Sequence, residues 1–222
     1  AQFSNSKLSG DLFTPTSSNS IPKETGSSIQ LVTEGKIRGA LLDHFDASTA
    51  GDTIKMAMFY MSNRKIVKSL LDAADRGVVI RLILDPNKDG FGFHHNGTPN
   101  RPVVKELLKK SKNQIGVRWY HTQGEQFHSK ISFIKKHSGQ HVVILGSANM
   151  TRKNLDNYNM ETDVLLELER NSALVAEINA YLDMLWYNQG QSYTTDVTVF
   201  NDAGLLKTML YRFQEFTGLS TY

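Results

Sequence analysis

The stretch DTIKMAMFYMSNRKIVKSLLDAADRGVVIRLIL, residues 52–84, decides the fold class. Its two ends, DTIKMAMFY and VVIRLIL, are short apolar runs typical of buried strands. Between them, SNRKIVKSLLDAADRG has the apolar spacing of an amphipathic helix, which Ser62 is predicted to cap and Gly77 to end. A strand, a helix and a second strand in this order predict a parallel strand pair, so we expect an α/β protein.

The rest of the chain extends this pattern in both directions. Upstream, residues 35–48 have a helical apolar face, whereas residues 1–28 are rich in Ser, Thr, Asn, Gly and Pro and are predicted to be a linker or extended arm. Downstream we expect a helix begun by Asn100, a strand over residues 115–121, a helix over 172–189 and an amphipathic helix near 205–216. The predicted organisation is a single domain over residues 29–222.

Composition narrows the function classes. The 222 residues are 40% hydrophobic, enough for one sizeable core. A formal net charge of +3 and a pI near 9.0 suit an anionic substrate but fall short of a dense nucleic-acid-binding arm. The absence of cysteine excludes disulfides, thiol catalysis and cysteine-ligated zinc. No apolar run reaches the length of a membrane span, so we expect no transmembrane anchor in this chain.

Two further stretches carry the candidate chemistry: GEQFHSKISFI, residues 124–134, and VVILGSANMTR, residues 142–152. Side chains alternate faces along a strand, so His128 and Lys130 are expected on one face. A hairpin through KKHSGQH brings the Gly146–Asn149 turn back beside this pair. Glu161 opens the next predicted strand and is placed to hydrogen-bond an imidazole nitrogen.

In this order, His128-Ser129-Lys130, Gly146-Ser147-x-Asn149 and Glu161 resemble the HxK…GSxN…E signature of the phospholipase D superfamily. The preceding strand–helix–strand unit is also similar to that superfamily, and the resemblance runs from about residue 31 to 170. It implies an α/β/α sandwich in which helices flank a mixed sheet. The chain resembles the C-terminal half of a two-motif bacterial phospholipase D-like protein.

The resemblance also implies phosphodiester cleavage through a covalent phosphohistidine, without a metal or other cofactor. A neutral imidazole is a competent nucleophile, and lysine and asparagine stabilise charge on phosphoryl oxygens. The catalytic residues that it implies are His128, Lys130, Asn149, Glu161 and Ser147. The substrate-binding residues that we expect are Gly146, Arg152 and His121.

A zinc site is the alternative interpretation of His121, Glu125 and His128. The HExxH arrangement requires helical spacing, and Gly124 lies in a polar loop, so we predict no metal site there.

One HxK motif does not complete the implied mechanism, because a second histidine must protonate the leaving group. We therefore expect a second HxK half as a partner, either an upstream segment or an identical chain. His128 is then the nucleophile or the general acid. Lys135 departs from the pattern, since many superfamily members carry Asp at that position.

Three functions remain open at this stage. Hydrolysis or transfer of phospholipid head groups is the first hypothesis, and it favours a secreted or membrane-associated location. The second is a nuclease that cleaves DNA or RNA phosphodiesters, and the third is a non-catalytic phospholipase D-like assembly or binding module.

Overall fold

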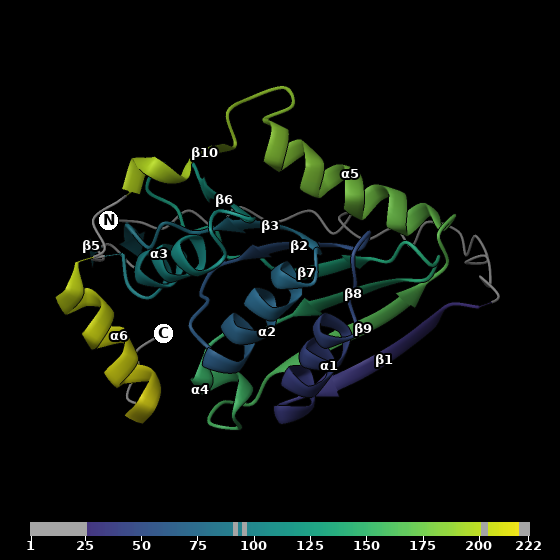
Figure 1. Ribbon diagram of the computed structural model, residues 1–222, viewed down its shortest axis with the longest axis horizontal. Coiled ribbons are helices and arrows are strands. Elements are labelled where there is room, and N and C mark those ends of the chain that lie inside the picture. The colour runs from purple at the N-terminus through teal and green to yellow at the C-terminus, as the bar shows by residue number, and fades with distance from the viewer. Residues whose placement is uncertain (1–25, 91–92, 95–96, 201–203, 218–222) are drawn as a thin grey trace, which may run out of the picture.

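The computed structural model describes residues 26–90, 93–94, 97–200 and 204–217. Within them, the main sheet has eight strands in the order β1-β9-β8-β7-β2-β3-β6-β10, and β4 and β5 form a separate pair (Figure 1). The strands are β1 (Ser28–Thr33), β2 (Thr53–Met58), β3 (Val79–Leu84), β4 (Asp89–Gly90), β5 (Phe93–His94), β6 (Ile115–Tyr120), β7 (Lys130–Lys135), β8 (His141–Gly146), β9 (Thr162–Leu168) and β10 (Thr194–Asp196).

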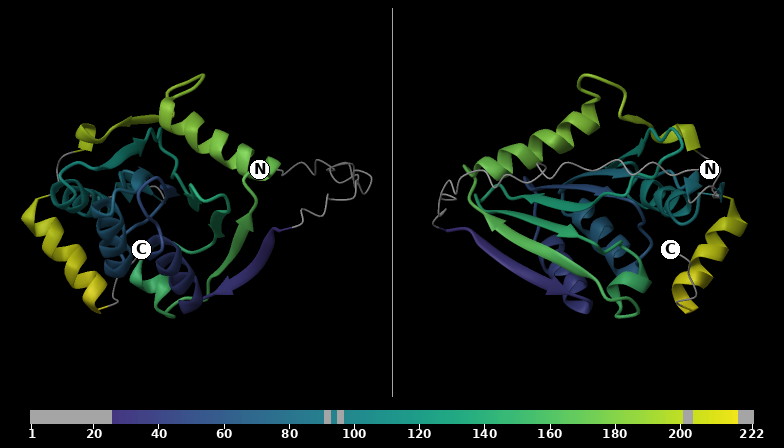
Figure 2. Two further views of the ribbon diagram at one scale, coloured as in Figure 1. Left: turned by 45° about the vertical axis from the view of Figure 1, so that its right-hand side comes forward. Right: turned by 180° about the vertical axis from the view of Figure 1, so that it is seen from behind.

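Helices cover both faces of this sheet (Figures 1 and 2). They are α1 (Gly35–Asp46), α2 (Arg64–Asp75), α3 (Asn100–Lys110), α4 (Arg152–Leu155), α5 (Ala173–Tyr187) and α6 (Leu205–Thr217), with a 3-10 helix at Val197–Phe200. The larger core lies between the sheet and α1, α2 and α3, and a smaller one lies between the sheet and α5. The predicted α/β/α sandwich is confirmed.

The strand directions confirm a mixed sheet. β2 pairs with β3 in parallel, with α2 as the connection, and β3 pairs with β6 in parallel. β7 is antiparallel to both β2 and β8, so the predicted hairpin through residues 136–140 is present. Because β7 runs antiparallel to β2 and β8, the end of β2, the start of β7 and the end of β8 lie together on one side of the sheet, where these strands terminate.

Two local predictions differ from the structure. Asn63 caps α2, since its side chain accepts the backbone N–H groups of Lys65 and Ile66, while the hydroxyl of Ser62 bonds to Glu215 of α6. The predicted arm also reaches into the sheet, because β1 begins at Ser28 and pairs antiparallel with β9. Residues 1–25, the rest of that arm, lie outside the described residues.

None of the helices in the described ranges combines the length and the apolar character that crossing a bilayer requires.

Candidate active site

His128 and Lys130 form the centre of the candidate site. Lys130 is the first residue of β7, paired with Met58 at the end of β2, and His128 lies just before the strand. The Lys130 Nζ lies 3.1 Å from Nδ1 and 3.1 Å from Nε2 of His128, and donates to the His128 carbonyl at 3.2 Å. The buried Phe59 ring supports both groups, 4.9 Å from the imidazole centroid and 5.6 Å from the ammonium. The predicted juxtaposition of His128 and Lys130 is therefore present.

The surroundings favour a neutral imidazole. Partial burial of the ring and then the Lys130 charge lower the pKa of His128 below its ordinary 6.5. Burial also lowers the pKa of Lys130, while the carboxylates of Glu161 and Asp163 oppose that effect. The His128 side chain is exposed, so an imidazole with a lowered pKa faces solvent beside a cation.

Asn149 is held by backbone bonds between two loops. Its Oδ1 accepts the Tyr60 N–H at 3.3 Å, and the Met150 N–H donates to the Tyr60 carbonyl at 3.0 Å. The Met150 carbonyl in turn accepts the N–H groups of Ser62 and Asn63, both at 2.8 Å. With its oxygen turned to Tyr60, the Asn149 amide has its NH₂ group available to donate to a phosphoryl oxygen.

Glu161 organises the turn after β8. Its carboxylate accepts hydrogen bonds from the Ser147 hydroxyl and from the Asn154 amide. The Thr162 N–H donates a hydrogen bond to Ser147 Oγ at 3.1 Å. These contacts occupy Glu161 within its own chain, so its expected bond to a catalytic imidazole stays a prediction.

Gly146 ends β8 at a point where the backbone of the neighbouring strand β9 lies very close. A Cβ at this position would lie 2.3 Å from Asp163 Oδ1 and 2.5 Å from the Thr162 carbonyl. Only glycine allows β8 and the start of β9 to lie so close at this position. Because they do, the Ala148 N–H can donate to Asp163 Oδ1 at 3.0 Å. Gly146 therefore shapes the turn that presents Ser147 and Asn149.

A buried polar network that the sequence did not indicate lies beneath the site. Asp85, at the end of β3, accepts the Phe127 N–H at 2.7 Å and the Asn87 N–H at 2.6 Å. Asn100 accepts the Met61 N–H at 2.8 Å and donates to the carbonyls of Phe59 and Asp85. The network fixes the loop that precedes His128 and the loop that bonds Asn149. The one sign of this network in the sequence is the placement of polar residues directly after predicted strands.

The two other expected substrate-binding residues lie apart from this cluster. The Arg152 guanidinium bonds to the carbonyls of Glu215 and Phe216 in α6, and its backbone N–H to the Glu215 carboxylate. His121 follows β6, is exposed, and lines a separate cavity of about 200 Å³ with Lys88 and Tyr120. The structure shows Arg152 holding α6, and a substrate role for either residue stays a prediction.

Within the described residues, no second imidazole contacts His128, and no three His, Cys, Asp or Glu side chains are grouped as metal ligands would be. The cluster in one chain therefore offers one imidazole, one cation and one amide donor at the edge of the sheet.

Comparisons with known proteins identify the family and the fold. A family model described as "Cardiolipin synthase, PLD-like domain" matches residues 42–186. Among solved structures, Nuc from Salmonella typhimurium, a phospholipase D family member, matches with a TM-score of 0.55 and 21% identity over 77% of this chain and 99% of that one. NucT from Helicobacter pylori matches with a TM-score of 0.57 and 16% identity over 72% and 96% of the two chains.

A third match is phosphatidylserine synthase from Haemophilus influenzae, with a TM-score of 0.61 and 12% identity over 87% of this chain and 46% of that one. At these identities the structures establish a shared fold only. No curated protein sequence matches the chain. The family model covers more than half of the 222 residues, and the chain belongs to the family of cardiolipin synthase-type, phospholipase D-like domains.

Proposed function

We propose that the protein is a metal-independent phosphodiesterase that works through a phosphohistidine, in a site completed by a second HxK motif. The family it belongs to is one of phosphodiesterases. The observation that carries the proposal is the exposed His128 with the Lys130 ammonium 3.1 Å from its ring nitrogens, where burial and the Lys130 charge lower the pKa of the imidazole. That pair supplies a nucleophile and a fixed positive charge without a metal.

The proposed reaction has two displacements. One imidazole nitrogen attacks phosphorus, a P–N bond forms and the P–O bond to the leaving group breaks. The leaving oxygen takes a proton from the imidazolium of the second motif. That imidazole then removes a proton from water or an alcohol, whose oxygen attacks phosphorus as the P–N bond breaks. The Lys130 ammonium and the Asn149 NH₂ group stabilise the charge on the non-bridging oxygens.

An identical chain is the proposed source of the second motif. Phospholipase D-like domains commonly pair two halves in a dimer. In such a pair, His128 of one chain acts as nucleophile and the same residue of the other chain acts as general acid.

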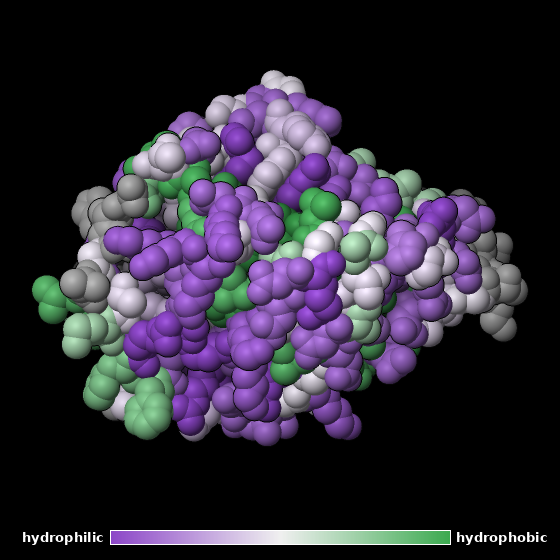
Figure 3. Space-filling view, viewed as in Figure 1, coloured by the Kyte–Doolittle hydropathy of each residue, from purple (hydrophilic) through white to green (hydrophobic). Residues whose placement is uncertain are grey.

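A phospholipid is the substrate class that we favour, and the support comes from α6. The exposed side chains of this helix include Leu206 (84% exposed), Met209 (69%), Phe213 (59%) and Phe216 (81%), and Figure 3 shows apolar residues gathered over α6. The helix is bonded through Arg152 to the loop that carries Asn149. An apolar helix face held by the residues that follow Asn149 suits a substrate presented at a lipid surface.

The first test is hydrolysis of bis(p-nitrophenyl) phosphate in excess EDTA. The unaltered chain should turn over, His128→Asn should lose at least about a thousandfold in rate, and His44→Asn, a matched change in α1, should leave the rate unchanged. Equal rates for the unaltered chain and His128→Asn would overturn the proposal. So would dependence on an added divalent metal.

The second test separates the substrate classes. Vesicles of phosphatidylglycerol and phosphatidylcholine should release head groups, while plasmid DNA should stay intact under the same conditions. Degradation of DNA in EDTA without head-group release would assign the chain to the nuclease alternative. Activity on neither substrate, with hydrolysis of the chromogenic ester retained, would overturn the choice of phospholipid but not the phosphodiesterase chemistry.

A further inference from the structure

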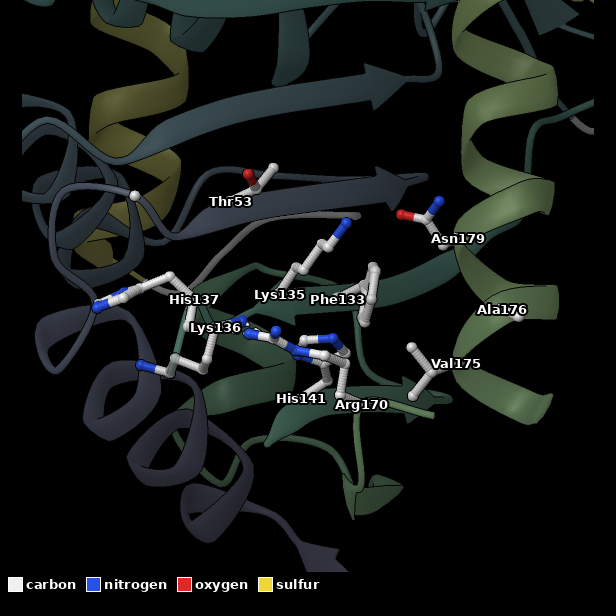
Figure 4. Close-up of a pocket in the computed structure, with 11 residues that line it drawn as sticks. Thr53, Phe133, Lys135, Lys136, His137, His141, Arg170, Val175, Ala176 and Asn179 are labelled. Carbon is white, nitrogen blue, oxygen red and sulfur yellow. Dashed lines mark hydrogen bonds between the residues drawn. The ribbon is translucent and has the colours of Figure 1, made fainter. Parts of the chain in front are cut away.

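Lys135, which departs from the superfamily pattern, lines a pocket that the proposed reaction does not use. Lys135 ends β7, and the pocket beside it has a volume of about 520 Å³ (Figure 4). The wall comes from the starts of β2 and β8, the β7–β8 hairpin, Arg170 and the first turns of α5. A cavity of this size is typical of sites for small molecules.

The charge of the pocket is one-sided. No Asp or Glu lines it, whereas Lys135, Lys136 and Arg170 do. Lys136 lies 3.8 Å from the buried carboxylate of Asp52, which therefore offsets its charge. Among the described residues, neither Lys135 nor Arg170 has a carboxylate partner, and both side chains are exposed. The Arg170 guanidinium donates to the His137 carbonyl, which carries no charge, so two cations without a carboxylate partner line the pocket.

His141 adds a ring N–H group to the pocket lining. It is the first residue of β8, is 1% exposed, and its Nδ1 accepts the Lys136 backbone N–H at 3.2 Å. The ring proton therefore lies on Nε2. Burial lowers the pKa of His141, and the charges of Lys135 and Arg170 lower it further, so both cations act at the ring. Figure 4 shows His141 and Arg170 on one side of the pocket and Lys135 extending toward α5.

The remaining wall is apolar. Phe133 of β7 and Val175 and Ala176 of α5 line it beside the cations. Phe133 is fully buried and meets the His141 ring edge-on, with centroids 5.9 Å apart. A ligand with an anionic end and an organic body would find a partner for each part.

This pocket is distinct from the catalytic cluster. Lys130 and Lys135 are the first and last residues of β7, so they lie about 17 Å apart along the strand and point to opposite faces of the sheet. A phosphodiester held by His128 and Lys130 does not reach the pocket at the other end of β7.

We propose that this pocket is a second anion site, which binds a phosphate group through Lys135, Arg170 and the Nε2–H of His141. The phosphate is free phosphate or the end of a phosphomonoester whose organic part lies against Val175 and Ala176. Two cations and a neutral donor match the doubly charged, multiply accepting oxygens of such a group.

Isothermal titration calorimetry of the full chain with inorganic phosphate and with phenyl phosphate tests the proposal. The titrations are made in the His128→Asn, Lys130→Met background, which removes the catalytic anion site. Binding should persist there, and adding Lys135→Gln or Arg170→Gln should weaken it at least about tenfold each. Tighter binding of phenyl phosphate would identify a phosphomonoester, and equal affinities would identify free phosphate.

The controls separate this pocket from general charge effects. Lys109→Gln removes one exposed positive charge from α3 and should leave the affinity unchanged. Arg170→Lys should keep part of the affinity that Arg170→Gln loses. Thermal unfolding of each variant reports whether it is folded. Folded Lys135→Gln and Arg170→Gln chains that bind phosphate as tightly as their parent would overturn the proposal, as would binding that disappears with Lys130→Met alone.

Discussion

At the scale of single residues, Gly146 shows how closely the candidate site depends on backbone packing. A Cβ there would overlap the Thr162 carbonyl and the Asp163 Cα, and neither of these backbone atoms can withdraw without moving β9. We predict that Gly146→Ala lowers the free energy of unfolding by about 2 kcal/mol and reduces turnover more than tenfold, because the turn bearing Asn149 shifts. Urea denaturation and the chromogenic assay measure the two effects.

Gly39→Ala is the matched control. Gly39 lies in α1, and a Cβ there meets nothing within 4 Å, so the substitution should stabilise the fold by about 0.5–1 kcal/mol and leave turnover intact. Equal stability of Gly146→Ala and the unaltered chain would show that β9 accommodates the methyl group.

The pairing of His128 with Lys130 gives a prediction about pH. Since burial and the Lys130 charge both disfavour the imidazolium, the folded pKa of His128 lies below 6.5. Lys130→Met removes the positive neighbour, so the titration of His128 should move to higher pH. Proton NMR of the His128 Cε1–H resonance measures this directly, without the coupled titrations that enter a rate profile.

Lys109→Met removes a charge of the same type from an exposed position on α3 and should leave the His128 titration in place. An unchanged titration in Lys130→Met, or one at lower pH, would contradict the electrostatic account. If Lys130→Met lost turnover at every pH, the ammonium would also act on the substrate itself, in addition to its effect on the pKa of His128.

At the scale of elements, Glu106 of α3 joins three helices. Its carboxylate accepts from Arg64 of α2, Lys110 of α3, and Tyr211 and Arg212 of α6, at 2.7–2.9 Å. Burial alone would raise its pKa, but the bonds from Arg64, Lys110 and Tyr211 outweigh burial and lower the pKa to about 2. The ionised form is therefore the one that the folded state stabilises.

We predict that Glu106→Gln lowers the free energy of unfolding by roughly 2 kcal/mol at pH 7. The folded pKa of about 2 lies below the ordinary 4.5, so the contribution is complete above pH 4.5 and is lost as the pH falls toward 2. The difference between variant and parent should therefore shrink from pH 7 to pH 3 in urea denaturation. Glu177→Gln, an exposed change in α5, should show no such trend, and a constant difference for Glu106→Gln would contradict the prediction.

The elements that the sequence predicts correctly are those whose pattern is local. The apolar runs of β2 and β3, the stripe of α2 and the hairpin between β7 and β8 all have the expected periods. β1 was missed because its Ile29 and Leu31 are more than 70% exposed, and its pairing with β9 joins segments more than a hundred residues apart. Edge strands formed by distant pairing leave a weak signal in the chain.

The residues of the candidate site also separate into those that a local pattern predicts and those that depend on distant contacts. His128 and Lys130 lie together as predicted, although His128 precedes β7, because the Lys130 ammonium turns back to the His128 ring and carbonyl. The hairpin adds Asn149. Asp85 and Asn100 could not be predicted, since their roles depend on bonds to Phe127 and Met61 across 42 and 39 residues. The bonds of Arg152 could not be predicted either, because its partners lie in α6, more than sixty residues away.

At the scale of the whole molecule, the candidate site is an open edge rather than an enclosed cleft. His128 is exposed, and no second imidazole reaches it within the described part of the chain. The proposed chemistry needs two imidazoles with opposite protonation states. A second chain placed against this edge would supply the missing group, and the resulting pair would contain one shared site rather than two.

This sharing can be measured by mixing chains. The unaltered chain and His128→Asn are unfolded together in urea, refolded in equal amounts and assayed on bis(p-nitrophenyl) phosphate. If each site needs His128 from both chains, activity should be about a quarter of that of the same total amount of unaltered chain, whereas independent sites would give about a half. Mixing with His44→Asn should retain full activity, which controls for losses on refolding. A linear fall with the fraction of His128→Asn would show that one chain holds a complete site, and a fall with the square of the unaltered fraction would place both histidines in one site.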